Sequence, residues 1–146
     1  MRDVYAKARP DYSGRVTVPV LWATRGGTIV NNESAEIIRM FNAEFGRGGP
    51  DFYPAALRAE IDAINARGYE TVNNEVYRCG FAGSQEAYEE AFDALFATLD
   101  TLEARLGSRR YLAGAAMAEA DWRLFPTLVR FDAVYYSHFK CNLRRI

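Results

Sequence analysis

The sequence predicts a mainly α-helical protein that begins with a short β-hairpin. Apolar, β-branched stretches typical of strands occur within residues 1–32, whereas apolar residues after position 32 recur every three or four positions, as on one face of a helix. Hydrophobic residues make up 49% of the 146-residue chain and aromatic residues 14%, far more than a disordered chain contains. A chain of this length forms one domain, or one domain with part of another.

Two short strands are expected near the amino terminus. The first covers Val16–Trp22 and the second Thr28–Val30, and Arg25–Gly27 between them favours a tight turn. Residues 1–13 are polar and interrupted by Pro10, so they offer no further strand. Because two strands alone are only marginally stable in water, we expect that part of a sheet is missing from this sequence.

A helix should follow the hairpin. Asn31 or Asn32 is its expected cap, Glu33 lies in its first turn, and Gly46 should end it. Four apolar residues share one face of this helix: Ile37, Ile38, Phe41 and Phe45.

The glycines and proline of Gly46–Pro50 indicate a linker. We therefore expect a first domain at residues 1–46 and a second at residues 51–146. In the second, a helix opened by Pro54 should falter at Gly68 and then resume.

The most regular helical pattern runs from Ser84, its expected N-cap, to about Leu106, where Gly107 should terminate it. Its apolar stripe has steps of three and four residues: Tyr88, Phe92, Leu95, Leu99, Leu102 and Leu106.

The last helix should span Glu119–Tyr136. It is apolar around much of its circumference, which is typical of a buried element: Trp122, Leu124, Phe125, Leu128, Val129, Phe131 and Val134. Such a helix needs cover on several sides, so we expect further helices to be missing and an apolar patch to be exposed. Pro126 inside this helix should cost about 3 kcal/mol, and Ala118 at its cap about 1 kcal/mol.

The charge balance argues against two classes of partner. The formal net charge is −1, from 18 basic and 19 acidic residues, so neither nucleic acid nor an anionic membrane is indicated. The charged start lacks the apolar stretch of a signal peptide, and no apolar run approaches the roughly 20 residues that span a bilayer. We therefore expect a cytoplasmic protein.

Few residues of the chain suit nucleophilic or metal chemistry. Cys79 and Cys141 are far apart in the sequence, and we interpret both as reduced thiols. Arg78 beside Cys79 would lower the pKa of that thiol, but a buried, inert thiol is the simpler interpretation. His138 and Cys141 could share a helix face, yet two ligands do not make a zinc site, so no metal is predicted.

Two segments near the hairpin suit binding of a small peptide. Pro19 in the middle of a strand implies an edge, and a cis bond after Val18 would leave the Val18 N–H and C=O free to pair with an extended ligand. Helix N-terminal N–H groups at Ser34 favour a carboxylate, and the Glu33 side chain suits an ammonium group. These are the requirements of the γ-glutamyl end of glutathione, although an edge strand with an ordinary cap explains the same residues.

Several segments resemble the Xi-class glutathione transferases, also called glutathionyl-hydroquinone reductases. Gly14–Trp22 and Asn32–Asn42 resemble the end of the thioredoxin-type domain of that family. The resemblance continues through six further segments: Val72–Asn74, Val76–Ala82, Ser84–Tyr88, Ala120–Phe125, Leu128–Asp132 and His138–Asn142.

The resemblance implies a fold and an activity. Residues 1–46 would be the end of a thioredoxin-like α/β domain, and residues 51–146 the first helices of the all-α C-terminal domain. The family reaction reduces glutathionyl-hydroquinones with glutathione as co-substrate. Its catalytic cysteine lies in an upstream Cys-Pro-Trp-Ala motif, so neither Cys79 nor Cys141 inherits that role. The implied partners are glutathione and an aromatic, quinone-type substrate, and a homodimer is compatible with the resemblance.

The resemblance also implies roles for individual residues. Val18 and Pro19 would hold the glutathione backbone, and Glu33 and Ser34 its γ-glutamyl end. Tyr77 matches a family tyrosine near the aromatic substrate, where a phenol hydrogen-bonds an oxygen, and a plain core tyrosine is the alternative.

Departures from the family pattern leave a second hypothesis open. Ala23 stands where an acidic residue is usual, and Glu75 replaces a glycine before Val76, which would disturb a backbone turn. Ala118 replaces a threonine. The alternative to an enzyme is a non-catalytic helical interaction module, or a decayed and inactive copy. An in-frame Cys-Pro-Trp-Ala segment before Met1 would favour the enzyme.

Overall fold

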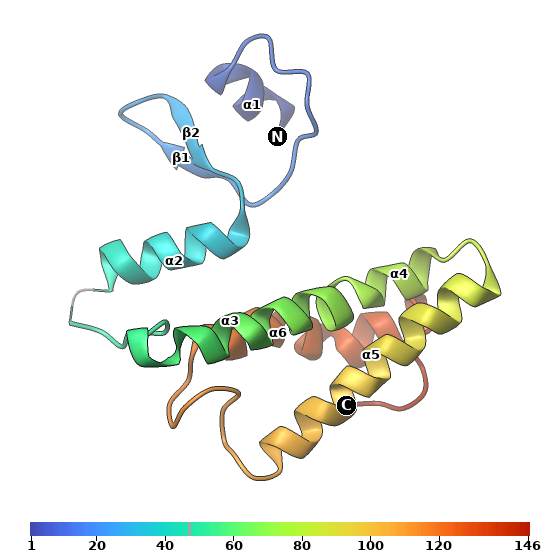
Figure 1. The fold of residues 1–146 in the computed structure, drawn as a ribbon. Coiled ribbons are helices and arrows are strands. Elements are labelled where there is room, and N and C mark those ends of the chain that lie inside the picture. Colours follow the sequence, from blue (N-terminus) through green and yellow to red (C-terminus); the bar gives the residue numbers. More distant parts are fainter. Residues whose placement is uncertain (47) are drawn as a thin grey trace. The chain divides into compact units, whose positions relative to one another are not determined.

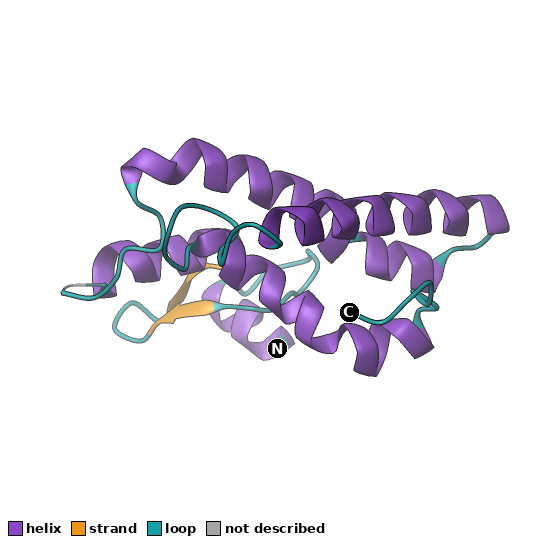
Figure 2. Ribbon diagram, turned by 90° about the horizontal axis from the view of Figure 1, so that it is seen from below, coloured by secondary structure: helices purple, strands orange, loops and turns teal. Residues whose placement is uncertain are grey.

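A computed structural model describes residues 1–46 and 48–146 (Figure 1). The chain divides into two compact units, Met1–Asp51 and Phe52–Ile146, and each is described by itself. The expected linker Gly46–Pro50 includes Arg47, which lies outside the described residues. The expected fold class is confirmed: a two-stranded antiparallel hairpin is accompanied by helices that make up most of the chain (Figure 2).

The first unit begins with a helix that the sequence did not predict. Helix α1 spans Arg2–Ala8, within the stretch interpreted as irregular, and ends before Pro10. Its buried residue is Tyr5, which is 4% exposed. The helix is too short for its apolar residues to show a helical repeat in the sequence. Because such a short helix is not stable alone, it is stabilised by the contacts of Tyr5.

The hairpin is shorter than expected. Strand β1 is Leu21–Ala23 and strand β2 is Thr28–Asn31, with Trp22 opposite Ile29. The strand therefore does not begin at Val16, because Pro19 has no N–H to donate and no described strand lies beside residues 16–20. The expected turn is present, and Gly27 adopts a φ of 62° there, a conformation that suits glycine.

Helix α2, Ser34–Phe45, ends before Gly46 as expected, but its cap is Glu33 and neither asparagine. The Glu33 carboxylate accepts the Ala35 N–H at 3.4 Å. The Asn31 side chain instead accepts the N–H of Glu33 at 2.6 Å. Asn31 therefore binds the backbone of the cap residue and not the first turn of the helix.

Four helical segments follow one another at the start of the second unit. A short 3-10 turn, Ala55–Leu57, precedes helix α3, Arg58–Gly68. The expected break at Gly68 is a π-helical segment, Tyr69–Asn73, that leads into helix α4, Glu75–Phe81. A π-helical turn shifts the register of the apolar face without ending the helix, and Val72 therefore stays fully buried.

Helix α5, Gln85–Leu106, confirms the predicted boundaries. The Ser84 hydroxyl caps it by accepting the Ala87 N–H at 3.2 Å, and Gly107 follows its last residue. The α5 stripe packs into a core shared with α3, α4 and α6. The fully buried larger side chains of this unit are Ile61, Val72, Val76, Leu95, Leu112, Phe131 and Cys141.

Helix α6, Glu119–Arg130, runs on through a π-helical segment, Phe131–Tyr135, into α7, Tyr136–His138. It passes behind α3 in Figure 1 and packs against it. The helix is not buried on most sides, but the expected exposed apolar patch is present. Leu124 is 5% exposed, but Trp122, Phe125 and Val129 are 48%, 54% and 58% exposed.

The missing cap at Ala118 is compensated locally. The Asp121 carboxylate accepts the Ala118 N–H at 2.9 Å and also the Leu112 N–H at 2.9 Å. Asp121 therefore serves the first turn of α6 and in addition fixes the loop that precedes it.

Candidate functional site

In the first unit, the Tyr5 hydroxyl connects the two segments predicted to bind glutathione. It donates to the Thr17 carbonyl at 3.0 Å and accepts from the Asn32 side-chain amide at 3.1 Å. Thr17 directly precedes Val18, and Asn32 directly precedes Glu33. Hydrogen bonds with Thr17 and Asn32 lower the pKa of the Tyr5 phenol. One buried side chain thus holds both segments in place.

The Val18–Pro19 peptide bond is cis. Val18 is 68% exposed, and the whole segment from Gly14 to Pro19 lies at the surface of its unit. The structure thus leaves the Val18 side chain accessible, but it does not test which ligand this segment binds.

Glu33 and Ser34 are both exposed at the start of α2. The Glu33 carboxylate makes a long hydrogen bond of 3.4 Å to the Ala35 N–H. A second hydrogen bond joins the side chains of Asn31 and Glu36 across the helix start. This arrangement offers a carboxylate, a hydroxyl and helix N–H groups on one exposed surface, a combination that suits an amino acid with both of its charges.

Tyr77 lies in the second unit, on α4, and is 47% exposed. Its hydroxyl is 3.2 Å from that of Tyr135. Burial, followed by the hydrogen bond with Tyr77, raises the pKa of Tyr135 to about 12. Phe81 and Phe139 surround Tyr77 with ring centroids 6.5 Å and 5.4 Å away. Tyr77 is therefore no plain core residue; it is an exposed member of an aromatic cluster, together with Phe81, which is 76% exposed.

The two cysteines are free thiols, as expected, and both are buried. They are far apart in the sequence, yet they lie in the same core, close enough for each thiol to shift the pKa of the other. Sequence spacing gave no signal of this proximity, because it arises from the packing of α4 against the segment after α7. His138 is exposed whereas Cys141 is buried outside the helix, so the two do not share a helix face.

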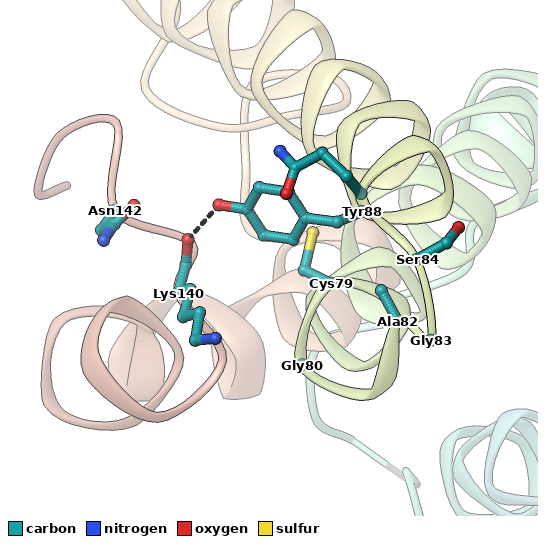
Figure 3. Close-up of a pocket in the computed structure, with 9 residues that line it drawn as sticks. Cys79, Gly80, Ala82, Gly83, Ser84, Tyr88, Lys140 and Asn142 are labelled. Atoms are coloured by element: carbon teal, nitrogen blue, oxygen red, sulfur yellow. Dashed lines mark hydrogen bonds between the residues drawn. The ribbon is translucent and has the colours of Figure 1, made fainter.

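Cys79 also borders a cavity of about 440 Å³ (Figure 3). The other lining residues come from the α4–α5 connection, the start of α5 and the segment after α7: Gly80, Ala82, Gly83, Ser84, Gln85, Tyr88, Lys140 and Asn142. Burial raises the pKa of the Tyr88 phenol, and the two nearby thiols add to this effect.

The departure at Glu75 leaves the backbone helical, because α4 begins at this residue. Glu75 is 4% exposed and pairs through Oε1 with Arg78 at 2.6 Å, which raises the pKa of the Arg78 guanidinium. The disturbance of a backbone turn that the sequence predicted at Glu75 is therefore not observed.

The described residues contain no group of three or more potential metal ligands from histidine, cysteine, aspartate and glutamate. None of the described helices combines the length and apolarity needed to cross a bilayer.

Comparisons with known proteins agree with this arrangement. Residues 85–145 match the family model of the glutathione S-transferase C-terminal domain. Glutathionyl-hydroquinone reductase PcpF of Sphingobium chlorophenolicum is 62% identical over 147 residues, covering 99% of this chain and 47% of that protein. Glutathionyl-hydroquinone reductase YqjG of Escherichia coli K12 is 58% identical, with 99% of this chain and 45% of that protein covered.

The chain is a homologue of the Xi-class glutathione transferases.

Solved structures of such transferases extend the match to the fold. The glutathione-bound structure of YqjG from Escherichia coli K-12 superposes with a TM-score of 0.95 at 56% identity, covering 99% of this chain and 48% of that one. Glutathione transferase Xi 1 from Trametes versicolor gives 0.94 at 56% identity, with 99% and 52% covered. This homologue thus spans about half the length of the relatives that it matches.

Proposed function

We propose that these 146 residues act in a glutathione-dependent reductase of glutathionyl-hydroquinones. The observation that carries the proposal is the Tyr5 hydroxyl, which joins the residue before Val18 to the residue before Glu33. Two segments whose chemistry suits glutathione are held together by one buried group. The names of the relatives support the substrate class.

In this proposal, residues 1–46 are the end of a thioredoxin-like domain and bind glutathione. The backbone N–H and C=O of Val18, beside Pro19, pair with the backbone of the tripeptide. Glu33 takes the ammonium group of the γ-glutamyl end, and the hydroxyl and N–H of Ser34 take its carboxylate. Each contact uses a group that is exposed on the first unit.

Residues 51–146 are, in the same proposal, the opening helices of the all-α domain. Tyr77 contributes an exposed phenol that hydrogen-bonds an oxygen of the hydroquinone ring. Its partner Tyr135, whose pKa is about 12, stays protonated at neutral pH and holds the Tyr77 hydroxyl in place.

The nucleophile is a cysteine thiolate that is not among these residues, since no Cys-Pro-Trp-Ala segment occurs in them. The thiolate forms a bond to the glutathione sulfur, the bond from that sulfur to the ring breaks, and the ring carbon takes a proton as the hydroquinone leaves. A second glutathione then attacks the resulting mixed disulfide, which releases glutathione disulfide and restores the thiolate. We further propose a cytoplasmic location, where glutathione is abundant and thiols stay reduced.

The second candidate function is a non-catalytic helical module or an inactive copy. It is favoured because these residues contain no Cys-Pro-Trp-Ala segment that would supply the family nucleophile. Under this hypothesis, the exposed apolar side chains of α6 would contact another protein and glutathione would not bind.

Two measurements separate these functions. Calorimetric titration of the chain with glutathione should give binding that weakens at least about tenfold in the Glu33→Ala/Ser34→Ala double variant, because charge-assisted hydrogen bonds are lost. Glu44→Ala, an exposed acid at the far end of α2, is the matched control and should bind like the parent. Unchanged binding in the double variant would rule out this site.

The catalytic part is tested by turnover of a glutathionyl-hydroquinone. The 146 residues alone should be inactive, and joining them to the preceding segment of the Escherichia coli relative should produce activity that is lost on Tyr77→Phe. Turnover by the chain alone that disappears in Cys79→Ser would show that the nucleophile has been assigned wrongly. An inactive fusion that still folds would favour the non-catalytic module.

A further inference from the structure

The two cysteines of the chain lie in the core of the second unit, and one of them, Cys79, borders the cavity. Cys79, on α4, is 4% exposed, and Cys141, after α7, is fully buried. The Cys141 sulfur lies 3.8 Å from the Phe139 carbonyl and 4.0 Å from the carbonyl of Val76, which is about one helical turn before Cys79 on α4, and each thiol shifts the pKa of the other. A pair of thiols in contact can be oxidised to a disulfide without a large rearrangement of the chain.

The backbone around the pair is built for this close approach. A Cβ atom at Gly80 would lie 2.4 Å from the ring of Phe139, so only glycine lets that segment pack against α4. Lys140 has a φ of 59°, which is uncommon outside glycine, and the Tyr88 hydroxyl donates to its carbonyl at 2.7 Å. These contacts turn the chain so that Cys141 points into the core.

Only one of the two thiols borders the cavity. Cys79 belongs to its lining, whereas Cys141 does not (Figure 3). The volume of about 440 Å³ far exceeds the roughly 30 Å³ that one water molecule occupies, so a small oxidant fits beside Cys79. Lys140 and the capped start of α5 at Ser84 add positive potential to the same cavity.

The two sulfur atoms also differ in acidity. The hydrogen bond from Cys141 lowers the pKa of Cys79, with help from Arg78 and against the effects of burial and of Glu75. The same hydrogen bond, together with burial, raises the pKa of Cys141. Cys79 is therefore the thiol that ionises first, and Cys141 keeps its proton.

We propose that Cys79 and Cys141 form a peroxide-sensitive thiol pair, in which Cys79 reacts at the cavity and Cys141 completes a disulfide. The Cys79 thiolate attacks one oxygen of a hydroperoxide, the O–O bond breaks, and a sulfenic acid and water form when the peroxide is hydrogen peroxide. The Cys141 sulfur then displaces the hydroxyl group of the sulfenic acid, with release of a second water. Two thiols lose two electrons and two protons, and one peroxide is reduced to two waters.

This pair is distinct from the nucleophile and from the glutathione site of the proposed function. The disulfide would tie α4 to the segment after α7, next to the aromatic cluster of Tyr77. A thiol such as glutathione would reverse it by exchange, first forming a mixed disulfide and then glutathione disulfide.

The test is oxidation of the folded chain with hydrogen peroxide, followed by thiol counting and peptide mass mapping. We expect both thiols to disappear together, with a linked Cys79–Cys141 peptide and with recovery on reduction. Formation should be at least about tenfold faster than in the urea-denatured chain, where the two cysteines meet only at random. Survival of both thiols under peroxide exposure that oxidises free cysteine would overturn the proposal, as would disulfides between chains.

Single variants separate the two roles. Cys141→Ser should stop at a sulfenic acid on Cys79 that dimedone labels, whereas Cys79→Ser should leave Cys141 unlabelled. Dimedone label on Cys141 in Cys79→Ser at the parent rate would contradict the assignment. These serine substitutions keep the size of each side chain, and circular dichroism confirms that each variant is folded.

A matched pair of substitutions tests the route through the cavity. Gln85 lines the cavity and its neighbour Glu86 does not, and both are exposed in the first turn of α5. Gln85→Trp should slow the loss of thiols, and Glu86→Trp should leave the rate unchanged. Equal rates in the two variants would show that peroxide reaches Cys79 by another route and would overturn the role given to the cavity.

Discussion

The side-chain amide of Asn32 donates to the hydroxyl of Tyr5 at 3.1 Å, across 27 positions of the sequence. The same hydroxyl holds the Thr17 carbonyl at 3.0 Å. The Asn32 amide also donates to the Thr17 hydroxyl at 3.3 Å, so Tyr5 and Asn32 together hold the cis segment at Val18 and the start of α2 in a fixed arrangement.

Removing that hydroxyl should weaken glutathione binding without removing any proposed contact to glutathione. We expect Tyr5→Phe to lower the affinity roughly fivefold, because the hydrogen bonds of its hydroxyl with Thr17 and Asn32 no longer order the two segments. Calorimetric titration measures this. Tyr12→Phe is the control, since the Tyr12 hydroxyl donates only to the Arg15 carbonyl, at 2.7 Å. Equal affinities in the two variants would contradict the role given to Tyr5.

This contact could not be predicted from the sequence, and the reason is physical. Helix α1 has seven residues and one buried side chain, so no period could be recognised. The hydrogen bonds of Tyr5 join residues that are distant in sequence, and a single sequence records no such pairing. Helix α5 shows the opposite case: its Ser84 cap, long apolar stripe and Gly107 end are all local signals, and its boundaries were predicted correctly.

Other features of the structure could be predicted from the sequence only in part. Asn31 or Asn32 was expected to cap α2, yet Asn31 accepts the Glu33 N–H and Glu33 is the cap. Residue preferences alone do not decide between these neighbouring positions. The proximity of Cys79 and Cys141 likewise depends on how Phe139 packs on Gly80. The predicted glutathione and substrate residues were chosen by their chemistry and by family resemblance, and they stay predictions.

Gly80 should be intolerant of any side chain. A Cβ there would lie 2.4–2.9 Å from atoms of Phe139, so Gly80→Ala must displace that ring or α4. We expect a loss of about 2 kcal/mol in the free energy of unfolding, typical of overpacking. Gly83→Ala is the control, because nothing lies within 4 Å of its Cβ position. Urea denaturation measures both, and equal midpoints would contradict the close approach.

Asp121 should contribute more to stability than an ordinary surface acid. Asp121→Ala leaves the Ala118 and Leu112 N–H groups without their acceptor, so we expect a loss of about 2 kcal/mol. Asp100→Ala removes an exposed ion pair with Arg144 and should cost less than about 1 kcal/mol. Thermal denaturation compares the two variants. A smaller loss of stability in Asp121→Ala than in Asp100→Ala would contradict the role given to Asp121 at the start of α6.

The Tyr77–Tyr135 pair should make stability fall at high pH. The pKa of Tyr135 is raised in the folded chain to about 12, so its protonated form is favoured there. This contribution is fully present below the unfolded pKa of about 10 and is lost as the pH rises from about 10 to 12. Tyr135→Phe should therefore show a smaller loss of stability over that interval than the parent. Denaturation at several pH values measures it, with Tyr136→Phe as control, and parallel curves for parent and Tyr135→Phe would refute the assignment.

The exposed side of α6 should bind an apolar dye. Trp122, Phe125 and Val129 recur at helical spacing and are 48%, 54% and 58% exposed, so they form an apolar stripe on the surface of the second unit. We expect the chain to be poorly soluble and to bind 8-anilinonaphthalene-1-sulfonate. The double variant Phe125→Gln/Val129→Gln should lower dye binding with little loss of stability, because these side chains make few core contacts.

Leu124→Gln is the matched control on the same helix. Leu124 is 5% exposed, so the substitution places an unpaired amide in the core and should cost at least about 2 kcal/mol while dye binding increases. Thermal denaturation with dye fluorescence follows both effects. A sharp transition without dye binding in the parent would mean that the stripe is covered in solution, for example by a second copy of the chain. That result would favour the helical interaction module over the reductase.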